Sequence, residues 1–253
     1  MLIGAAVKEG AARGAVLRPL FSYYSFHGPV FRVMLEVRRG KAWPSEHYSF
    51  VGHCHVHGDT RRVGWRGLGD AVCTCCRGAH GSAGGGGGGR STPLAVSGPM
   101  WTGPLHDRGF VEAMASEAER LGWSGHAVPL DSVHREKSSK NNNQRPLEDL
   151  LQLFWDEADP KLPPWYVPID EIAKRLDRSP SKDELIHALR AEGYAASGCH
   201  VDRKALRTDA SMGQVAEVAR GIGYTPRDCC GGGGSGGSGG GGAGAVGEAA
   251  ARG

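Results

Sequence analysis

The sequence predicts an α+β fold in which three regions of different character follow one another. Strand-like runs rich in Tyr, Phe and Val fill the first part, and two Cys/His pairs with metal-ligand spacing come next. Near the end, two short amphipathic helices precede a strand. We therefore expect a small sheet, then a zinc-knuckle region, then a C-terminal helical unit with winged-helix character.

The N-terminal region is predicted to contain one helix and three strands. Residues 2–12 carry apolar side chains at helical spacing, and Gly14 can end that helix. No cap residue precedes it, so we expect further sequence upstream of the first Met. The strands of one small sheet are expected at residues 17–26, 30–37 and 47–52. Alternation in the second strand predicts one apolar face, made by Phe31, Val33, Leu35 and Val37.

Three Gly-rich or polar stretches separate or follow the predicted helices and strands. Residues 77–96 include six consecutive Gly, and residues 229–253 are mostly Gly, so neither stretch can bury apolar surface and both are predicted to be disordered. Residues 124–145 are polar and predict a surface loop.

The C-terminal half is predicted to be mainly helical. Asp107 can cap a helix that runs to Leu121 and ends at Gly122, and residues 147–158 form an amphipathic helix. A winged helix is expected at residues 165–222. Its elements are helices at 169–176 and 182–191, strands at 194–201 and 203–208, and a closing helix at 211–220.

Two C-x-x-[C/H] pairs separated by 15 residues predict a tetrahedral Zn²⁺ site. Thiolates suit this metal because it stabilises deprotonated sulfur. The favoured ligands are Cys54, His57, Cys73 and Cys76, and the rival donors are His53, His55, Cys75 and His80. The alternative is a chance cluster in a Gly-rich region.

Charge is distributed unevenly although the formal net charge is only +3. Residues 1–100 hold 12 Lys or Arg against 5 Asp or Glu, which can attract phosphates. Candidate RNA-binding residues are Arg61, Arg62, Trp101, His106, Arg203, Lys204 and Arg207. The last three cluster where a wing is expected, and Trp101 can serve either packing or base stacking. The alternative is an ordinary solvated charged face.

Other classes of function find little support. No run of about 18 apolar residues and no signal peptide is present, which predicts a soluble intracellular protein without a membrane partner. The clustered cysteines suit a reducing compartment better than a disulfide framework. Gly84 to Gly89 lack the strand-turn-helix setting of a cofactor loop, so we assign no catalytic and no cofactor-binding residue.

Several motifs together resemble one known family. They are PLFSYYSFHGPVFRVMLEVRRGK, the two Cys pairs, GPMWTGPLHD, LPPWYVPIDEIAKRL, SKDELIHALRAEGY and RTDA, and the resemblance that they carry covers about residues 1–222. Their order is similar to that in tRNA (guanine-26 N2)-dimethyltransferases. The sequence departs from that family at His57, at Cys199-His200 and in its Gly tracts.

The resemblance implies an S-adenosylmethionine-dependent tRNA methyltransferase, with tRNA as partner and no obligate protein partner. Residues 1–52 then resemble the end of a class I, Rossmann-like methyltransferase domain, 53–96 the zinc-knuckle region, and 97–228 a tRNA-engaging domain before the tail at 229–253. The segment that binds the methyl donor precedes this region in the family, so we expect this chain alone to be inactive. The rival hypothesis is a stand-alone module for binding nucleic acid or protein.

Overall fold

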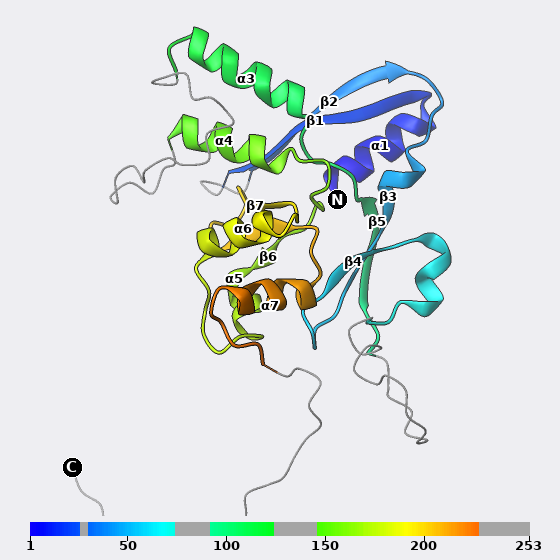
Figure 1. The fold of residues 1–253 in the computed structure, drawn as a ribbon. Coiled ribbons are helices and arrows are strands. Elements are labelled where there is room, and N and C mark those ends of the chain that lie inside the picture. Colours follow the sequence, from blue (N-terminus) through cyan, green and yellow to red (C-terminus); the bar gives the residue numbers. More distant parts are fainter. Residues whose placement is uncertain (26–29, 74–91, 124–145, 228–253) are drawn as a thin grey trace, which may run out of the picture.

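A computed structural model describes residues 1–25, 30–73, 92–123 and 146–227, and it has mixed α and β structure (Figure 1). The strands form three small sheets, in the orders β1-β2, β4-β3-β5 and β6-β8-β7. Every strand pairing in these sheets is antiparallel. The α+β class is thus confirmed at this level. In the described part of the chain, no helix combines the length and apolar character that crossing a membrane requires.

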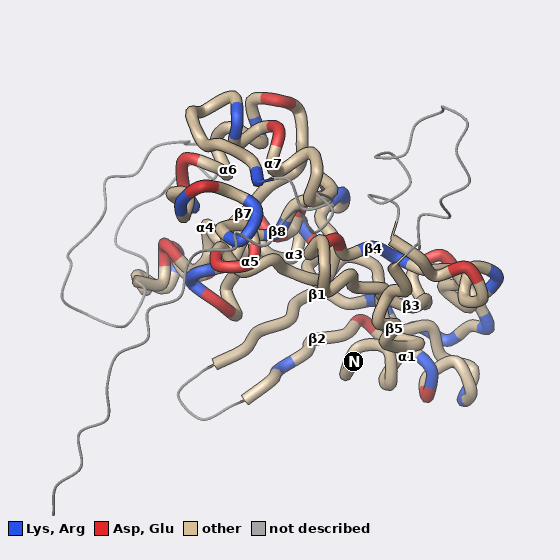
Figure 2. Tube along the Cα trace, turned by 90° about the horizontal axis from the view of Figure 1, so that it is seen from below, with Lys and Arg blue, Asp and Glu red and all other residues tan. Residues whose placement is uncertain are grey.

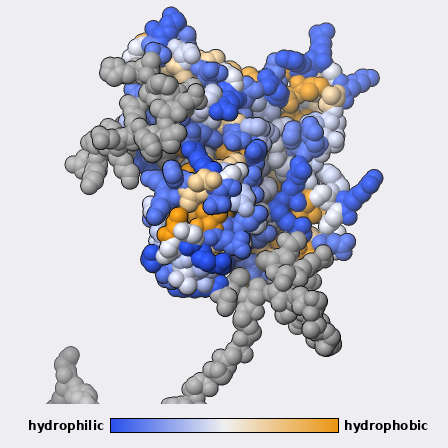
Figure 3. Space-filling view, in the orientation of Figure 1, coloured by the Kyte–Doolittle hydropathy of each residue, from blue (hydrophilic) through white to orange (hydrophobic). Residues whose placement is uncertain are grey.

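The N-terminal helix packs beside a long hairpin. Helix α1 (Leu2–Ala12) has the predicted bounds and buries Ile3 and Val7 next to Trp101. Strands β1 (Ala15–Ser25) and β2 (Val30–Arg39) pair only with each other among the described residues. The apolar face predicted on β2 is only partly covered: Val33 packs against the cluster of Ile3, Val7 and Trp101, whereas Phe31 is 60% exposed and Val37 is 64% exposed. Apolar side chains accordingly reach the surface around α1 and this hairpin (Figure 3).

The third predicted strand belongs to a different sheet from the first two. Strand β3 (Tyr48–His53) lies between β4 (Thr60–Val63) and β5 (Ala95–Trp101), after the short 3₁₀ helix η1 (Ser45–His47). A second 3₁₀ helix, η2 (Trp65–Asp70), follows β4. The expectation of a single sheet was therefore wrong. Strand β3 also crosses the domain boundary expected between residues 52 and 53. Strand β5 crosses the one expected between residues 96 and 97.

Two helices cover one end of the hairpin. Helix α3 (Arg108–Arg120) begins where predicted, because the Asp107 carboxylate accepts a 2.9 Å hydrogen bond from the Phe110 amide. Gly122 ends it with a φ of +68°, a conformation that glycine adopts without strain. Helix α4 (Leu147–Glu157) then packs against α3.

The C-terminal module, residues 165–227, has its own core. Its elements are β6 (Val167–Pro168), α5 (Ile169–Ala173), α6 (Lys182–Ala191), β7 (Ala196–Gly198), β8 (Ala205–Thr208) and α7 (Met212–Gly221). Leu176, Leu185, Leu189 and Leu206 are fully buried between them. Ser211 and Gln214 form a reciprocal capping box at the start of α7, whereas the side chain of Ser181 makes no capping hydrogen bond on α6.

Candidate metal centre and buried polar cluster

The first candidate site lies on the tight turn between β3 and β4. Cys54 follows the last residue of β3, and its amide donates to the Asp59 carbonyl oxygen at 2.8 Å. The Gly58 amide donates back to the Cys54 carbonyl oxygen at 2.7 Å, and Gly58 has a φ of +69°. A turn closed in this way brings the side chains of Cys54 and His57 together.

Three predicted ligands meet at this turn, and all three are buried. His57 Nδ1 lies 3.3 Å from Cys54 Sγ and 3.5 Å from Cys73 Sγ. A tetrahedral Zn²⁺ with ordinary bond lengths separates its sulfur and nitrogen ligands by about 3.5 Å. The His57 amide also donates to Cys54 Sγ at 3.3 Å. The three side chains therefore fit a zinc ion.

The chemical state of the ligands matters for this fit. Burial, and next the charge of Arg175, lower the pKa of His57, so its ring stays neutral and able to bind a metal. Cys54 is a free thiol, but Cys73 is disulfide-bonded. Metal binding at this site requires Cys73 in its reduced form. Cys76, the fourth predicted ligand, lies outside the described residues.

The rival donors are not part of this group. His53 Nδ1 lies 2.8 Å from the Thr60 hydroxyl, and the His53 and His55 rings contact each other instead. Cys75 and His80 fall outside the described residues.

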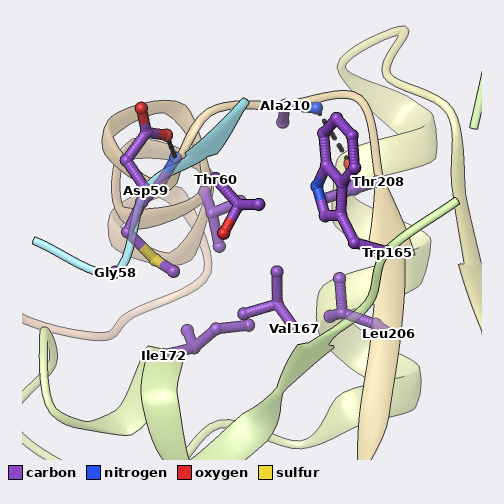
Figure 4. Close-up of a pocket in the computed structure, with 11 residues that line it drawn as sticks. Gly58, Asp59, Thr60, Trp165, Val167, Ile172, Leu206, Thr208 and Ala210 are labelled. Carbon is purple, nitrogen blue, oxygen red and sulfur yellow. Dashed lines mark hydrogen bonds between the residues drawn. The ribbon is translucent and has the colours of Figure 1, made fainter. Parts of the chain in front are cut away.

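The turn at residues 54–59, called the metal-ligand turn below, packs against the C-terminal module (Figure 4). Arg175 Nε donates to the His57 carbonyl oxygen at 2.9 Å, and the Met212 amide donates to the Asp59 carboxylate at 3.3 Å. Thr60 faces Trp165 across this contact, where only about 10 Å³ of space remains. That volume is close to the minimum for one water molecule, so the seam is closely packed.

A second buried cluster joins α4 to the sheet of the C-terminal module. Glu157 Oε2 lies 2.6 Å from His200 Nδ1 and 3.5 Å from His106 Nε2. Glu157 Oε1 lies 3.6 Å from Arg207 Nη1 and accepts from the His200 amide at 3.2 Å. Arg207 also donates through Nε and Nη2 to the Pro163 carbonyl oxygen. All four side chains are at most 4% exposed.

Electrostatics decide what this cluster can hold. Burial alone raises the pKa of Glu157, but the close contacts with His106 and His200 and the charge of Arg207 outweigh it, so the pKa falls well below its usual range. Glu157 is therefore ionised. Although two imidazoles and a carboxylate can bind a metal, the guanidinium of Arg207 already compensates the one negative charge and disfavours a second cation.

The structure separates the predicted RNA-binding residues into buried and exposed groups. His106 and Arg207 are each 2% exposed and Trp101 is 6% exposed, and Trp101 Nε1 donates to the Pro104 carbonyl oxygen. Arg207 and His106 thus lie in the buried cluster around Glu157, where Arg207 has no surface to offer a phosphate, and the burial of Trp101 favours packing over base stacking. Arg203 and Lys204 are exposed beside β8.

The other two predicted RNA-binding residues, Arg61 and Arg62, donate hydrogen bonds to backbone carbonyl oxygens of this chain. Arg61 is half-buried and donates to the Val72 carbonyl oxygen at 2.7 Å, and exposed Arg62 donates to that of Glu46 at 2.7 Å.

The sequence reasoning missed Glu157 and His200 as cluster members. Glu157 ends an amphipathic helix, where a carboxylate usually faces water, so no pattern marked it. The pair Cys199-His200 was visible only as a departure from the family pattern.

These features define a mixed α/β protein with a group of Cys and His side chains that could hold a metal ion, and solved structures share its fold. One is Trm1 from Pyrococcus horikoshii in complex with S-adenosyl-L-methionine, which has a TM-score of 0.56 and 19% identity to this chain. That match covers 86% of this chain and 47% of the other. The family model for N2,N2-dimethylguanosine tRNA methyltransferase matches residues 1–220, so the chain belongs to this family.

Curated relatives agree with this assignment. The tRNA (guanine(26)-N(2))-dimethyltransferase of Aeropyrum pernix is 25% identical over 229 residues, 88% of this chain and 47% of its own length. That of Methanosarcina barkeri is 28% identical over 88% of this chain and 50% of its own length. The Schizosaccharomyces pombe enzyme is 33% identical over 49% of this chain and 20% of its own length. The chain spans about half the length of the first two.

Proposed function

We propose that this chain is the tRNA-engaging part of a tRNA (guanine-26 N2)-dimethyltransferase. The observation that carries the proposal is the family match over residues 1–220, which takes in all the described elements except the last residues of the C-terminal module. On this proposal, residues 1–52 close a methyltransferase domain, 53–96 hold zinc and 97–228 engage tRNA.

The fold around the C-terminal module supports the assignment of tRNA binding to residues 97–228. The order α4, β6, α5, α6, β7, β8, with β6 and β7 flanking β8, is the order of a winged helix-turn-helix. In that architecture the β7–β8 connection is the wing, and it carries exposed Arg203 and Lys204. Figure 2 shows Lys and Arg interspersed with Asp and Glu on this module. Two adjacent basic side chains suit contact with a phosphate backbone.

The described residues do not fit S-adenosylmethionine. Dinucleotides and similar ligands of open α/β folds bind at the carboxyl ends of parallel strands, next to a Gly-rich turn and a helix N-terminus. All strand pairings in the described part of this chain are antiparallel. The proposal therefore assigns donor binding to residues outside this chain, and no methyl-transfer step is derived from the residues described.

The experiment measures tRNA binding and methyl transfer in parallel. The purified chain is titrated into unmodified tRNA transcript in a filter-binding assay, and separately incubated with tRNA and radiolabelled S-adenosylmethionine. We expect binding without label incorporation. A folded chain that does not bind tRNA contradicts the tRNA-engaging role and favours a protein-interaction module, and incorporation above a protein-free blank contradicts the assignment of the donor site.

A further inference from the structure

A cleft of about 920 Å³ opens between the β1–β2 hairpin, the β4-β3-β5 sheet and the loop that follows β7. A space of this size suits a small molecule or a nucleotide. Its lining is mainly apolar and contains five large aromatic side chains, Tyr23, Tyr24, Phe31, Trp101 and Trp165. Its polar part consists of Arg32, three histidines and two serines, and no carboxylate lines it among the described residues.

The aromatic rings at the hairpin end of the cleft are accessible. Phe31 is 60% exposed, and its ring lies 4.6 Å from that of Tyr24 at an interplanar angle of 34°. Tyr23, which precedes Tyr24 in β1, stacks with His200 at 6.3 Å and 26°. The lining of the cleft thus contains two pairs of neighbouring flat rings. A lining without carboxylates also tolerates the negative phosphates of a nucleotide.

His200 gives the cleft one positioned polar atom. Its Nδ1 faces the Glu157 carboxylate at 2.6 Å, and an ionised carboxylate only accepts, so Nδ1 carries a proton. The opposite ring nitrogen, Nε2, forms no hydrogen bond with any described residue, and its lone pair can accept one when that nitrogen carries no proton.

We propose that this cleft receives an unstacked nucleobase of RNA, with the base against Tyr24 and Phe31 and an N–H of its edge donating to His200 Nε2. The proposal rests on the tRNA-engaging role above and states which part of the RNA enters the chain. Single-stranded bases are recognised by stacking on aromatic rings combined with hydrogen bonds to the base edge. Glu157 is then a positioning residue, because it fixes the tautomer and orientation of His200 without touching the base.

The test separates bases from phosphates. A fluorescein-labelled single-stranded oligoribonucleotide of about 10 nucleotides is compared by anisotropy with a partner of equal length that is abasic at its central positions. Both probes carry the same phosphates, so a difference between them reports contacts with bases. The variants are Phe31→Ala, chosen because the side chain is exposed and its loss leaves the fold intact, and His200→Gln, checked for folding by circular dichroism. Trp123→Ala is the matched control, since Trp123 is 69% exposed and lies outside the cleft.

We expect the complete oligonucleotide to bind at least about fivefold more tightly than the abasic one. Phe31→Ala and His200→Gln should reduce that ratio toward one while leaving abasic binding unchanged, and Trp123→Ala should change neither.

Equal affinity of the two probes, or a ratio that survives Phe31→Ala, overturns the nucleobase cleft but leaves phosphate-based tRNA binding intact. Failure to bind either probe or tRNA overturns the proposed function as well. If light scattering shows a dimer that Phe31→Ala dissociates while the ratio persists, the cleft is a protein interface and the proposal is wrong.

Discussion

Arg175 connects helix α5 to the metal-ligand turn, because its Nε donates to the His57 carbonyl oxygen at 2.9 Å. The same guanidinium pairs with Glu171 at 3.0 Å, and Arg175 is only 9% exposed. A buried cation held by two partners is costly to release. The position of the His57 backbone is therefore tied to the packing of the C-terminal module.

Metal removal should loosen this contact. Purified under reducing conditions without chelator, the chain should contain about one Zn²⁺, because four ligands close a structural site. Chelation should increase amide hydrogen exchange in residues 54–60 and at Met212, whose amide donates to Asp59, while α3 remains unchanged. Exchange and metal content are measured on the same samples. Well under half an equivalent of zinc, or unchanged exchange at 54–60, would count against the site.

Single cysteine substitutions should identify the ligands. Cys54→Ser and Cys73→Ser should each lower zinc occupancy strongly, because a serine hydroxyl is a poor ligand for this metal. Cys73→Ser should have a larger effect than Cys75→Ser. Cys199→Ser is the control, since Cys199 is a buried free thiol outside the group. Equal zinc loss in all four variants would show that the assay reports general unfolding.

Glu157→Gln should destabilise the fold by about 3–5 kcal/mol, because it leaves the buried guanidinium of Arg207 without its charge partner. The neighbouring residue gives a matched control. Asp156 pairs with Arg190 at 3.1 Å near the surface, so Asp156→Asn should cost no more than about 1 kcal/mol. Urea denaturation at neutral pH measures both. Similar costs for the two variants would mean that the buried cluster contributes little to stability.

His106 should make stability depend on pH. Burial lowers its pKa, with a smaller opposing effect from Glu157, so the folded ring remains neutral where the unfolded ring takes up a proton. Stability should therefore fall as the pH drops below about 6.5, by up to about 1.4 kcal/mol per pH unit for this one group. His53 and His57 have lowered pKa values too and add to the slope.

The contribution of His106 is isolated by comparing the chain with His106→Gln. Urea midpoints between pH 5 and pH 8 should decline less steeply in the variant. Parallel pH profiles would exclude His106 as the source.

Local signals in the sequence predicted the helices well. Asp107 and Gly122 bound α3 because capping depends on residues within a few positions of the helix end. The Cys54–His57 pair was predictable for the same reason, since one turn brings both ligands together.

Features that depend on distant partners were not predictable in this way. Strand β5 contains Gly98-Pro99, a pair that is typical of turns and loops. It forms a strand because it pairs with β3. The alternation of β2 predicted an apolar face, but how much of that face is buried depends on a covering element, and Phe31 remains 60% exposed. Glu157 and Arg207 are 50 positions apart, so their ion pair leaves no local pattern.

Salt dependence provides the last prediction, for the exposed pair Arg203 and Lys204 on the β7–β8 connection. If both contact tRNA phosphates, their joint replacement by Gln should weaken binding to all tRNAs alike. Each lost contact should also flatten the plot of log affinity against log salt by about one unit, because fewer counterions are released. Arg61 and Arg62 make poorer probes, since both donate to backbone carbonyl oxygens and their loss disturbs loops.

The matched control removes the same charge from another surface. Lys8 and Arg13 are exposed at helix α1, away from the proposed wing, and the double Gln variant there should leave the slope unchanged. Affinities are measured at several salt concentrations for two different tRNAs. An Arg203/Lys204 variant with an unaltered slope would place the RNA-facing surface elsewhere. Equal flattening in both double variants would show that net charge, and not the wing, governs binding, because long-range attraction depends on charge regardless of its position.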